Sequence, residues 1–378
     1  MRVLLLADIH IGAIKDIDYI YHNTIDIIDR ELKLHKTDLL VILGDYFDRA
    51  LRVDESYTGL AINLMIHIVE ICMLTKTKIR IVYGTHSHDM NQYQLFNEYL
   101  VSKYVDFKVI KNVEEEIIGN KHILYVPEEY IFNKEEYYKD TLFNKDKHYD
   151  YIFGHGNISD ILPFDLNIYK RNQNEKHAPL FTINDLKDKC KLCIFGHYHL
   201  YKEVDNVIYV GSLYRWKFGE EENKGYGIIE NDKFQFIEND KAYIYKTYEF
   251  DENSLVYEDK NLLLKKLSRI KSENSKLFDN ECIGKIRLIF HPKSDNKEFN
   301  DTIRTLLLKE NNFALLIKEI TNEESEIINK IKKSEYEFIL DNSLSPIDKI
   351  HMFIEKKYDT NLSVSSIQNY IKQTIWLW

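Results

Sequence analysis

Five apolar runs in this chain each end in a short cluster of aspartate, histidine and glycine residues. The runs have the composition of buried strands, and segments with helical periodicity separate the first three. This order predicts parallel strands joined by helical crossovers, and α/β sheets collect their ligands at the carboxyl ends of such strands. The runs are Val3–Ala7, Leu39–Leu43, Ile79–Tyr83, Tyr151–Phe153 and Leu192–Phe195. The clusters that follow them are Asp8–His10, Gly44–Asp48, Gly84–Asp89, Gly154–Gly156 and Gly196–His199. We therefore expect the clusters to form one site.

The side chains in these clusters are those that hold a pair of divalent cations. Two cations about 3.5–4 Å apart need a bridging carboxylate, flanked by imidazole and oxygen ligands. Asp45 is the candidate bridge. A lone histidine after a strand is more often a hydrogen-bonded loop residue, but five clusters in order predict a dinuclear site. The candidate ligands are Asp8, His10 and His199 for one metal, and His155, His197 and an oxygen from the third cluster for the other.

The series of motifs resembles the calcineurin-like metallophosphoesterase superfamily, whose pattern runs D-x-H, G-D-x-x-D, G-N-H-D, G-H and G-H-x-H. The resemblance covers about the first 230 residues. A further segment, Val210–Glu220 followed by Lys224–Tyr226, is similar to the nuclease subunits of SbcCD-type complexes and their counterparts in double-strand-break repair. The second cluster reads G-D-x-F-D, as in the bacterial branch. The resemblance therefore points to the bacterial or phage branch of these nucleases.

The third cluster departs from the family pattern, because Gly84–Asp89 is two residues longer than G-N-H-D. Aligning Ser87 with the missing Asn makes Ser87 a metal ligand and His88 the imidazole that contacts the scissile phosphate and helps to protonate the leaving oxygen. Asp89 then orients His88, and Asp48 is the further residue that we expect to act in catalysis. His86 remains a competing ligand, because imidazole binds manganese or zinc better than a serine hydroxyl does.

The resemblance implies a manganese-dependent DNA nuclease that holds two divalent ions. Its activity would be exonucleolytic on double-stranded ends and endonucleolytic on single strands or hairpins. The expected partners are DNA, an SMC-like ATPase and a second copy of the chain. Two alternatives remain open: a phosphatase or cyclic-nucleotide phosphodiesterase of the same superfamily, and a noncatalytic binding subunit whose site is degraded at Ser87.

Composition sets looser limits. With 378 residues and 44% hydrophobic content, the chain exceeds one typical domain and can bury a core in each of two or more. We expect a cytoplasmic protein without a membrane partner, because no export segment or transmembrane run is evident and the four cysteines are scattered. The net charge of −10 requires that any DNA contact use a local basic surface. The candidates for this surface are Arg49, Arg52, Lys170, Arg171, Arg215 and Lys217.

Periodicity divides the chain into three parts. In residues 1–244 we expect helices at Asp16–Lys36, Asp54–Leu74 and Asn91–Tyr104, followed by hairpins around Gly119-Asn120 and Asp205-Asn206. The hairpins imply a second sheet. Two sheets face to face with helices outside form the four-layer α/β/β/α sandwich that the resemblance also implies.

The remaining residues form the other two parts. Residues 245–321 read as a small α/β unit without metal-site residues, which matches the family's DNA-selecting capping domain. Residues 322–378 read as a charged linker and a helical tail. By resemblance this tail docks on the coiled coil of the ATPase, although it could also pack on its own chain. The resemblance further implies that the chain forms a homodimer through Asp54–Leu74 and Asn91–Tyr104.

Overall fold

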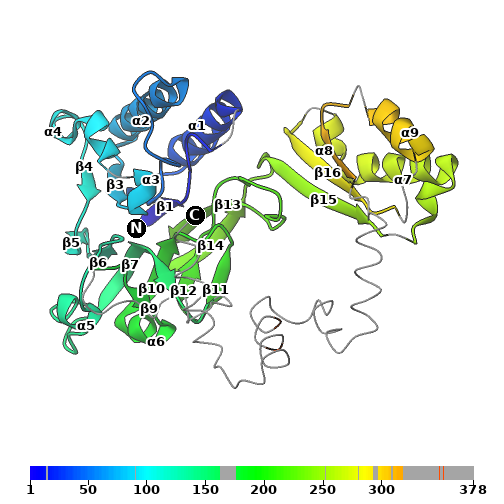
Figure 1. Cartoon of the computed structure of the whole chain (residues 1–378). Coiled ribbons are helices and arrows are strands. Elements are labelled where there is room, and N and C mark those ends of the chain that lie inside the picture. The colour runs from blue at the N-terminus through cyan, green and yellow to red at the C-terminus, as the bar shows by residue number, and fades with distance from the viewer. Residues whose placement is uncertain are drawn as a thin grey trace. The chain divides into compact units, whose positions relative to one another are not determined.

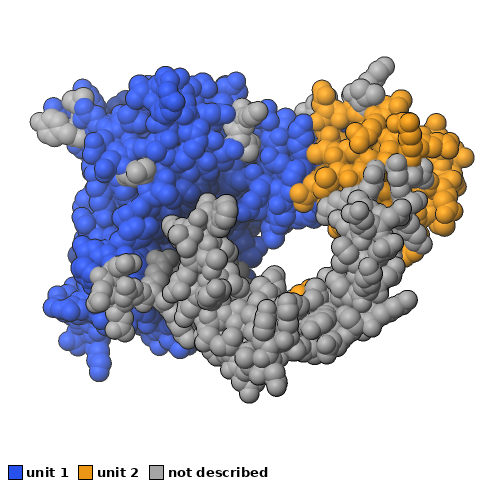
Figure 2. All heavy atoms as spheres, in the orientation of Figure 1, with its two compact units in different colours: residues 1–247, 274–286 blue, residues 248–273, 287–378 orange. Residues whose placement is uncertain are grey.

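The fold is known from a computed structural model of the chain. The structure describes residues 1–317 apart from 14–15, 90, 162–175, 252, 280, 293–296 and 308–309, together with 349 and 352. The expected linker and tail, residues 322–378, thus lie outside the described residues except at those two positions. Two compact units are present, one formed by residues 1–247 and 274–286 and the other by 248–273 and 287–378 (Figure 2).

The first unit contains a mixed sheet with the strand order β14-β13-β1-β2-β3-β4. Strands β1 to β4 run parallel to one another, as the helical crossovers predict, and β13 and β14 extend the sheet in antiparallel pairing. The bounds are β1 Arg2–Leu6, β2 Leu39–Leu43, β3 Lys78–Val82, β4 Phe107–Ile110, β13 Gly225–Glu230 and β14 Lys233–Glu238.

The second sheet of this unit is also mixed, with the order β11-β12-β10-β7-β6-β5. Its four central strands are parallel, and an antiparallel partner closes each edge. Both expected hairpins are confirmed, since β5 pairs with β6 and β11 with β12. The bounds are β5 Glu114–Ile118, β6 Lys121–Val126, β7 Tyr149–His155, β10 Cys190–Gly196, β11 Lys202–Val204 and β12 Val207–Tyr209, with a small pair of strands at β8 Asn157–Ile158 and β9 Leu180–Phe181.

The core forms because successive side chains along a strand point to opposite faces of the sheet. In β1 and the residue that follows it, Val3, Leu5 and Ala7 share a buried cluster with residues of both sheets, such as Phe153, so the two sheets pack face to face. Leu4 and Leu6 point the other way, into a cluster shared with α1 (Ile17–Leu34) and α2 (Ser56–Thr75). Figure 1 shows these two helices side by side. The protein is therefore an α/β protein with two mixed sheets, consistent with the metallophosphoesterase sandwich.

Shorter helices complete the first unit. They are α3 His86–Asp89, α4 Glu98–Val101, α5 Lys134–Tyr137, α6 Ile183–Leu186 and α8 Ser275–Phe278, with 3-10 helices at Gln92–Phe96 and Lys187–Lys189. The single helix expected at Asn91–Tyr104 is wrong, because Asn97 adopts a left-handed conformation with φ of 44° between the 3-10 helix and α4. Asparagine tolerates this conformation better than most residues, which explains the break.

Helix α2 is apolar on more than its buried face. Leu64 and Ile68 lie in the core, whereas Ile66 and Met73 are 49% and 44% exposed. Among the described residues α2 is the one helix that length and composition alone would allow to cross a membrane. The evidence for a span is nevertheless weak, because a core helix of this kind passes the same test.

A separate three-stranded sheet has the order β15-β16-β17. Its strands are β15 Ile244–Phe250, β16 Gly284–Phe290 and β17 Phe313–Ile317, and the accompanying helices are α7 Lys260–Glu273 and α9 Lys297–Leu307, with a 3-10 helix at Leu255–Tyr257. These strands and helices form an α/β arrangement, as expected for residues 245–321. The division into units does not follow the expected boundary at residue 245, because residues 274–286 belong to the first unit.

Candidate metal centre

The clusters predicted to form one site lie at the carboxyl ends of neighbouring strands. Asp8 follows β1 and Asp45 follows β2, which are adjacent parallel strands of the first sheet. His155 ends β7 and His197 follows β10, which are paired in parallel in the second sheet. The two sheets meet here, because the His197 backbone N–H donates to Asp8 Oδ1 at 3.0 Å.

Several of these residues have an unusual backbone conformation. Asp8, His10, Asp45 and His197 have φ angles of 51°, 47°, 49° and 104°, in the region that favours glycine. Each such residue costs about 1–3 kcal/mol, and strain of this kind concentrates at functional sites. Close backbone packing also requires Gly84, because a Cβ there would lie 2.3 Å from Asp45 Oδ1.

The first candidate group consists of Asp8, His10 and His199, whose ligand atoms lie within 4.8 Å of one another. The Nε2 atoms of His10 and His199 face each other at 2.9 Å. Glu220 Oε1 lies 3.0 Å from His199 Nδ1 and can accept its proton. A hydrogen bond of this kind orients a metal-ligating imidazole and leaves Nε2 free for the metal.

The second candidate group consists of Asp45, His155 and His197. His155 Nε2 lies 3.4 Å from Asp45 Oδ1 and 3.3 Å from His197 Nδ1. The other ring nitrogen of His155 lies 2.7 Å from the Leu43 carbonyl oxygen, which can only accept. His155 Nδ1 therefore donates, and this bond fixes the ring as second-sphere partners of metal ligands do.

Asp45 lies between the two groups. Its Oδ1 faces His155, and its Oδ2 lies 3.8 Å from His10 Nε2 and 2.9 Å from His88 Nδ1. Asp45 is buried, with 2% of its surface exposed. This is the placement expected of a bridging carboxylate.

The donor set fits two divalent cations. The ring nitrogens that face each other at 2.9 Å and 3.3 Å cannot all carry protons, so each pair has a lone pair available for a cation. Carboxylate and imidazole ligands suit manganese, iron or zinc. These buried histidine and aspartate groups are consistent with a binuclear metal site, and they do not select one metal.

Burial and mutual charge set the protonation of the free ligands. Burial raises the pKa of Asp8 to about 6 and lowers the pKa of His10 to about 3. Burial and the neighbouring His155 lower the pKa of His197 to about 3. His10 and His197 are thus neutral near pH 7, which is the form that binds metals. Burial opposes a charge on His155, but Asp45 outweighs it and raises the pKa of His155 to about 10.

His88 lies at the open side of the site. Its side chain is 32% exposed, and its Nδ1 contacts Asp45 Oδ2 at 2.9 Å. This hydrogen bond raises the pKa of His88 above its ordinary value. His88, Asp45 and His10 form a third group of potential metal ligands, so the geometry leaves two roles open for His88, as a proton donor or as a ligand.

Asp48 and Asp89, the two other residues predicted to act in catalysis, lie beside the candidate ligands. Asp48 Oδ1 lies 3.6 Å from His10 Nδ1, on the side of the ring away from His199. The buried Asp89 carboxylate accepts hydrogen bonds from the backbone N–H groups of Gly84 and Asp45, at 2.8 Å and 3.1 Å. Asp89 therefore fixes the loop that carries Asp45, whereas the sequence suggested that it orients His88.

The oxygen that the third cluster places near the site belongs to Thr85. Thr85 Oγ1 lies 3.2 Å from Asp45 Oδ2 and 3.3 Å from His155 Nε2. Ser87, the predicted ligand, is exposed on α3. His86 Nε2 lies 3.0 Å from the Glu128 carbonyl oxygen. The structure thus places Thr85, and not Ser87, beside the candidate metal groups, so the two extra residues of the loop follow Thr85 in this placement.

Sequence reasoning also missed Glu128 and Glu220. Glu128 lies two residues beyond β6, and its Oε2 is 3.7 Å from His197 Nδ1. The sequence contains a pattern that could have identified Glu128, because this residue follows an apolar run as the other clusters do. Pro127, however, separates Glu128 from that run. Glu220 belongs to the segment quoted for the resemblance, and only the fold shows that it contacts His199.

Comparisons with curated proteins and solved structures give limited information. No curated protein matches the chain. A solved structure described as a novel archaeal phosphodiesterase is 10% identical, covering 63% of this chain and 100% of its own, with a TM-score of 0.32. The glutamine-dependent NAD+ synthetase of Acinetobacter baumannii in complex with ADP is 10% identical, covering 93% of this chain and 70% of its own, also with a TM-score of 0.32. At these TM-scores neither match bears on function.

The family assignment rests on a match to a family model. The calcineurin-like phosphoesterase family matches residues 1–201, more than half of the 378 residues. This range contains every residue of the first candidate group, Asp8, His10 and His199, and of the second, Asp45, His155 and His197. The chain therefore belongs to the calcineurin-like phosphoesterase family.

Proposed function

We propose that this phosphoesterase is a manganese-dependent DNA nuclease of the SbcCD type. The observation that carries the proposal is the contact between the SbcCD-like segment and the site. Glu220 contacts His199 Nδ1 at 3.0 Å, and Lys224 Nζ donates to the His199 carbonyl oxygen at 2.6 Å. The segment that narrows the resemblance thus supports a candidate metal ligand from two sides.

The chemistry follows from the same residues. When bound, a pair of divalent cations supplies an activated water and positive charge for phosphodiester hydrolysis. Asp45 would hold both cations, and the histidines would fix them by neutral ring nitrogens. His88, partly exposed and hydrogen-bonded to Asp45, is placed to give a proton to the leaving oxygen.

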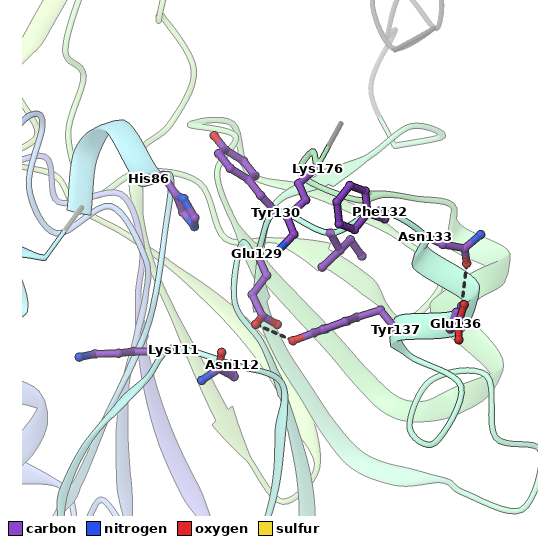
Figure 3. Close-up of a pocket in the computed structure, with 11 residues that line it drawn as sticks. His86, Lys111, Asn112, Glu129, Tyr130, Phe132, Asn133, Glu136, Tyr137 and Lys176 are labelled. Atoms are coloured by element: carbon purple, nitrogen blue, oxygen red, sulfur yellow. Dashed lines mark hydrogen bonds between the residues drawn. The ribbon is translucent and has the colours of Figure 1, made fainter. Parts of the chain in front are cut away.

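A groove beside the site supports a nucleic-acid substrate. It has a volume of about 720 Å³, and its lining includes Tyr130, Phe132, Lys111 and Lys176 (Figure 3). Tyr130 and Phe132 are 42% and 58% exposed, the Tyr130 ring lies 4.2 Å from that of His86, and Lys176 Nζ lies over the Phe132 ring at 5.4 Å. Exposed aromatic rings beside lysines are typical of surfaces that bind single-stranded nucleic acid. His86, which directly follows Thr85 in the chain, also lines the groove. A substrate lying in the groove would therefore pass close to the metal centre.

Two of the residues expected to form a basic surface are engaged with neighbouring carboxylates. Arg49 and Arg52 form ion pairs with Glu55 and Asp54, at 2.7 Å and 2.9 Å. Lys170 and Arg171 lie outside the described residues. The lysines of the groove are therefore better candidates for phosphate contact than the arginines near the second cluster.

A nuclease of this type would act together with partner molecules. We infer a cytoplasmic homodimer that binds DNA and an SMC-like ATPase. Residues 245–321 would act as the capping domain and limit which DNA ends reach the site. The tail, residues 322–378, would dock on the ATPase, and a truncation at residue 321 should abolish co-purification of the two proteins.

The test uses purified protein and DNA labelled at one end. Manganese-dependent degradation of a duplex, abolished by chelator and by Asp45→Asn, is the expected result. Asp45→Asn should lose metal and activity together, by more than about 100-fold, because it removes the charge that both cations share. Hydrolysis of phosphomonoesters or cyclic nucleotides without cleavage of DNA would favour the phosphatase or cyclic-nucleotide phosphodiesterase. Metal-independent DNA binding without hydrolysis would favour a binding subunit.

A further inference from the structure

Glu128 is a buried carboxylate that no part of the proposed mechanism uses. It follows β6, next to β7 in the second sheet, so it lies beside the strand end that carries His155. Only 3% of its surface is exposed. Backbone bonds hold it in place, because its N–H donates to the Tyr83 carbonyl oxygen at 3.1 Å and its own carbonyl oxygen contacts His86 Nε2 at 3.0 Å.

The Glu128 side chain is directed at the second metal group. Its Oε2 lies 3.7 Å from His197 Nδ1, the nitrogen that also faces His155. This oxygen is buried and has no hydrogen-bond partner among the residues that the structure describes. A buried carboxylate oxygen without a partner is costly, and such groups in native proteins are paired or bind a cation.

Apart from Asp45, which lies between the two groups, the members of the second group are both histidines. The family's Asn is absent, and the Thr85 hydroxyl that takes its place is a neutral oxygen 3.4 Å from His197 Nδ1. A glutamate oxygen carries negative charge and suits manganese better than a hydroxyl does. We propose that Glu128 is a ligand of the second divalent cation, together with Asp45, His155 and His197.

This assignment changes the charge of the site. Two carboxylates, Asp45 and Glu128, would hold the second cation, where the family pattern supplies one carboxylate and one amide. The added charge should tighten binding of this cation.

The chain offers a matched control in the neighbouring Glu129. Its Oε1 accepts a hydrogen bond from the Tyr137 hydroxyl at 2.5 Å, and its Oε2 accepts one from the Val113 N–H at 3.1 Å. Glu129 is thus an acid at the next position whose oxygens already have partners outside the metal groups. Glu129→Gln should leave metal binding unchanged.

The experiment measures metal directly, without DNA. Manganese bound per chain is determined by calorimetry and elemental analysis, and electron paramagnetic resonance detects a coupled pair of ions. Wild type and Glu129→Gln should bind two ions. Glu128→Ala should bind the second ion at least about tenfold more weakly and lose the coupled signal, with Glu128→Gln intermediate. Unchanged affinity for the second ion in Glu128→Ala would overturn the proposal.

A second measurement separates a ligand from a structural residue. If Glu128 serves the metal, Glu128→Gln removes an unpaired buried charge, so the metal-free variant should be at least as stable as metal-free wild type in thermal unfolding. Manganese should then stabilise the variant less than it stabilises wild type. A metal-free variant that is less stable, with the same gain from manganese as wild type, would also overturn the proposal. Neither result depends on the chain being a nuclease.

Discussion

At the scale of single residues, His88 holds the least settled position in the site. It contacts Asp45 at 2.9 Å, yet a third of its side chain is open to solvent. If it protonates the leaving oxygen, His88→Ala should lower the rate of hydrolysis by roughly 10²–10⁴-fold while both metals stay bound. Steady-state kinetics and metal analysis of the same preparation test this. Loss of one metal ion from the variant would make His88 a ligand instead.

Thr85 and Ser87 form a second pair of residues that an experiment can separate. Removal of the Thr85 hydroxyl by Thr85→Val takes away an oxygen that lies 3.2 Å from Asp45 Oδ2, so the second metal should bind about tenfold more weakly. Ser87→Ala changes an exposed side chain and should have no effect. Titration with manganese measures both variants. The reverse outcome would restore the alignment that the sequence suggested.

The sequence was informative where a side chain has a distinct chemistry and follows a strand. Asp8, His10, Asp45, His155 and His197 all come together as expected. Thr85 was missed because a threonine after a strand carries no metal-binding signal. The left-handed backbone conformations of the candidate ligands could not be predicted from the sequence either, because tertiary packing imposes them on these aspartate and histidine residues.

At the scale of elements, the ion pair between Arg80 and Glu116 joins the two large sheets. Arg80 of β3 bonds Glu116 of β5 through two nitrogens, at 2.5 Å and 2.8 Å. The Arg80 side chain is 3% exposed and that of Glu116 is 22% exposed. Breaking a fully buried ion pair costs roughly 3–5 kcal/mol. Glu116→Gln should lower the free energy of unfolding by less, about 2 kcal/mol, because Asp106 also contacts Arg80 and remains as its partner.

The pH dependence of this effect has a definite sign. Burial alone would raise the pKa of Glu116, but Arg80 outweighs it and holds that pKa below its ordinary value. The pair therefore stabilises the fold above the unfolded pKa of about 4.3, and this contribution is lost as the pH falls through the folded pKa. Denaturant unfolding should show a difference between wild type and Glu116→Gln that shrinks below about pH 4. Glu114→Gln, which breaks an exposed pair with Lys108, is the control and should cost less than about 1 kcal/mol.

Elements with strong periodicity were predicted well, including α1, α2 and both hairpins. The segment 91–104 was not, although its apolar residues have helical spacing. Tyr93 and Phe96 are both buried, which accounts for the spacing, but Asn97 breaks the helix between them and α4. Burial of a turn followed by a short helix can produce the same pattern as one helix, so periodicity alone could not distinguish them.

At the scale of the whole molecule, the sequence placed the dimer interface on apolar residues that the fold divides between core and surface. Leu64 of α2 is 1% exposed, so a charge there would unfold the chain and say nothing about assembly. Ile66 is 49% exposed on the same helix and is the better probe. Only the packing of α2 on the sheet shows which of its faces is buried and which is exposed. The sequence does not distinguish the two faces, because both are apolar.

If the chain is a homodimer through α2, a two-fold interface presents Ile66 twice, and Ile66→Glu would place two charges in an apolar contact. The variant should be a monomer with unchanged metal content, because Ile66 is remote in sequence from the candidate ligands and outside the core. Light scattering at several protein concentrations measures the state. Ile117→Glu is the matched control, since Ile117 is 72% exposed on β5 in the other sheet. A wild type that is monomeric at every concentration would refute the dimer. A dimer that survives Ile66→Glu as well as Ile117→Glu would move the interface away from the exposed face of α2.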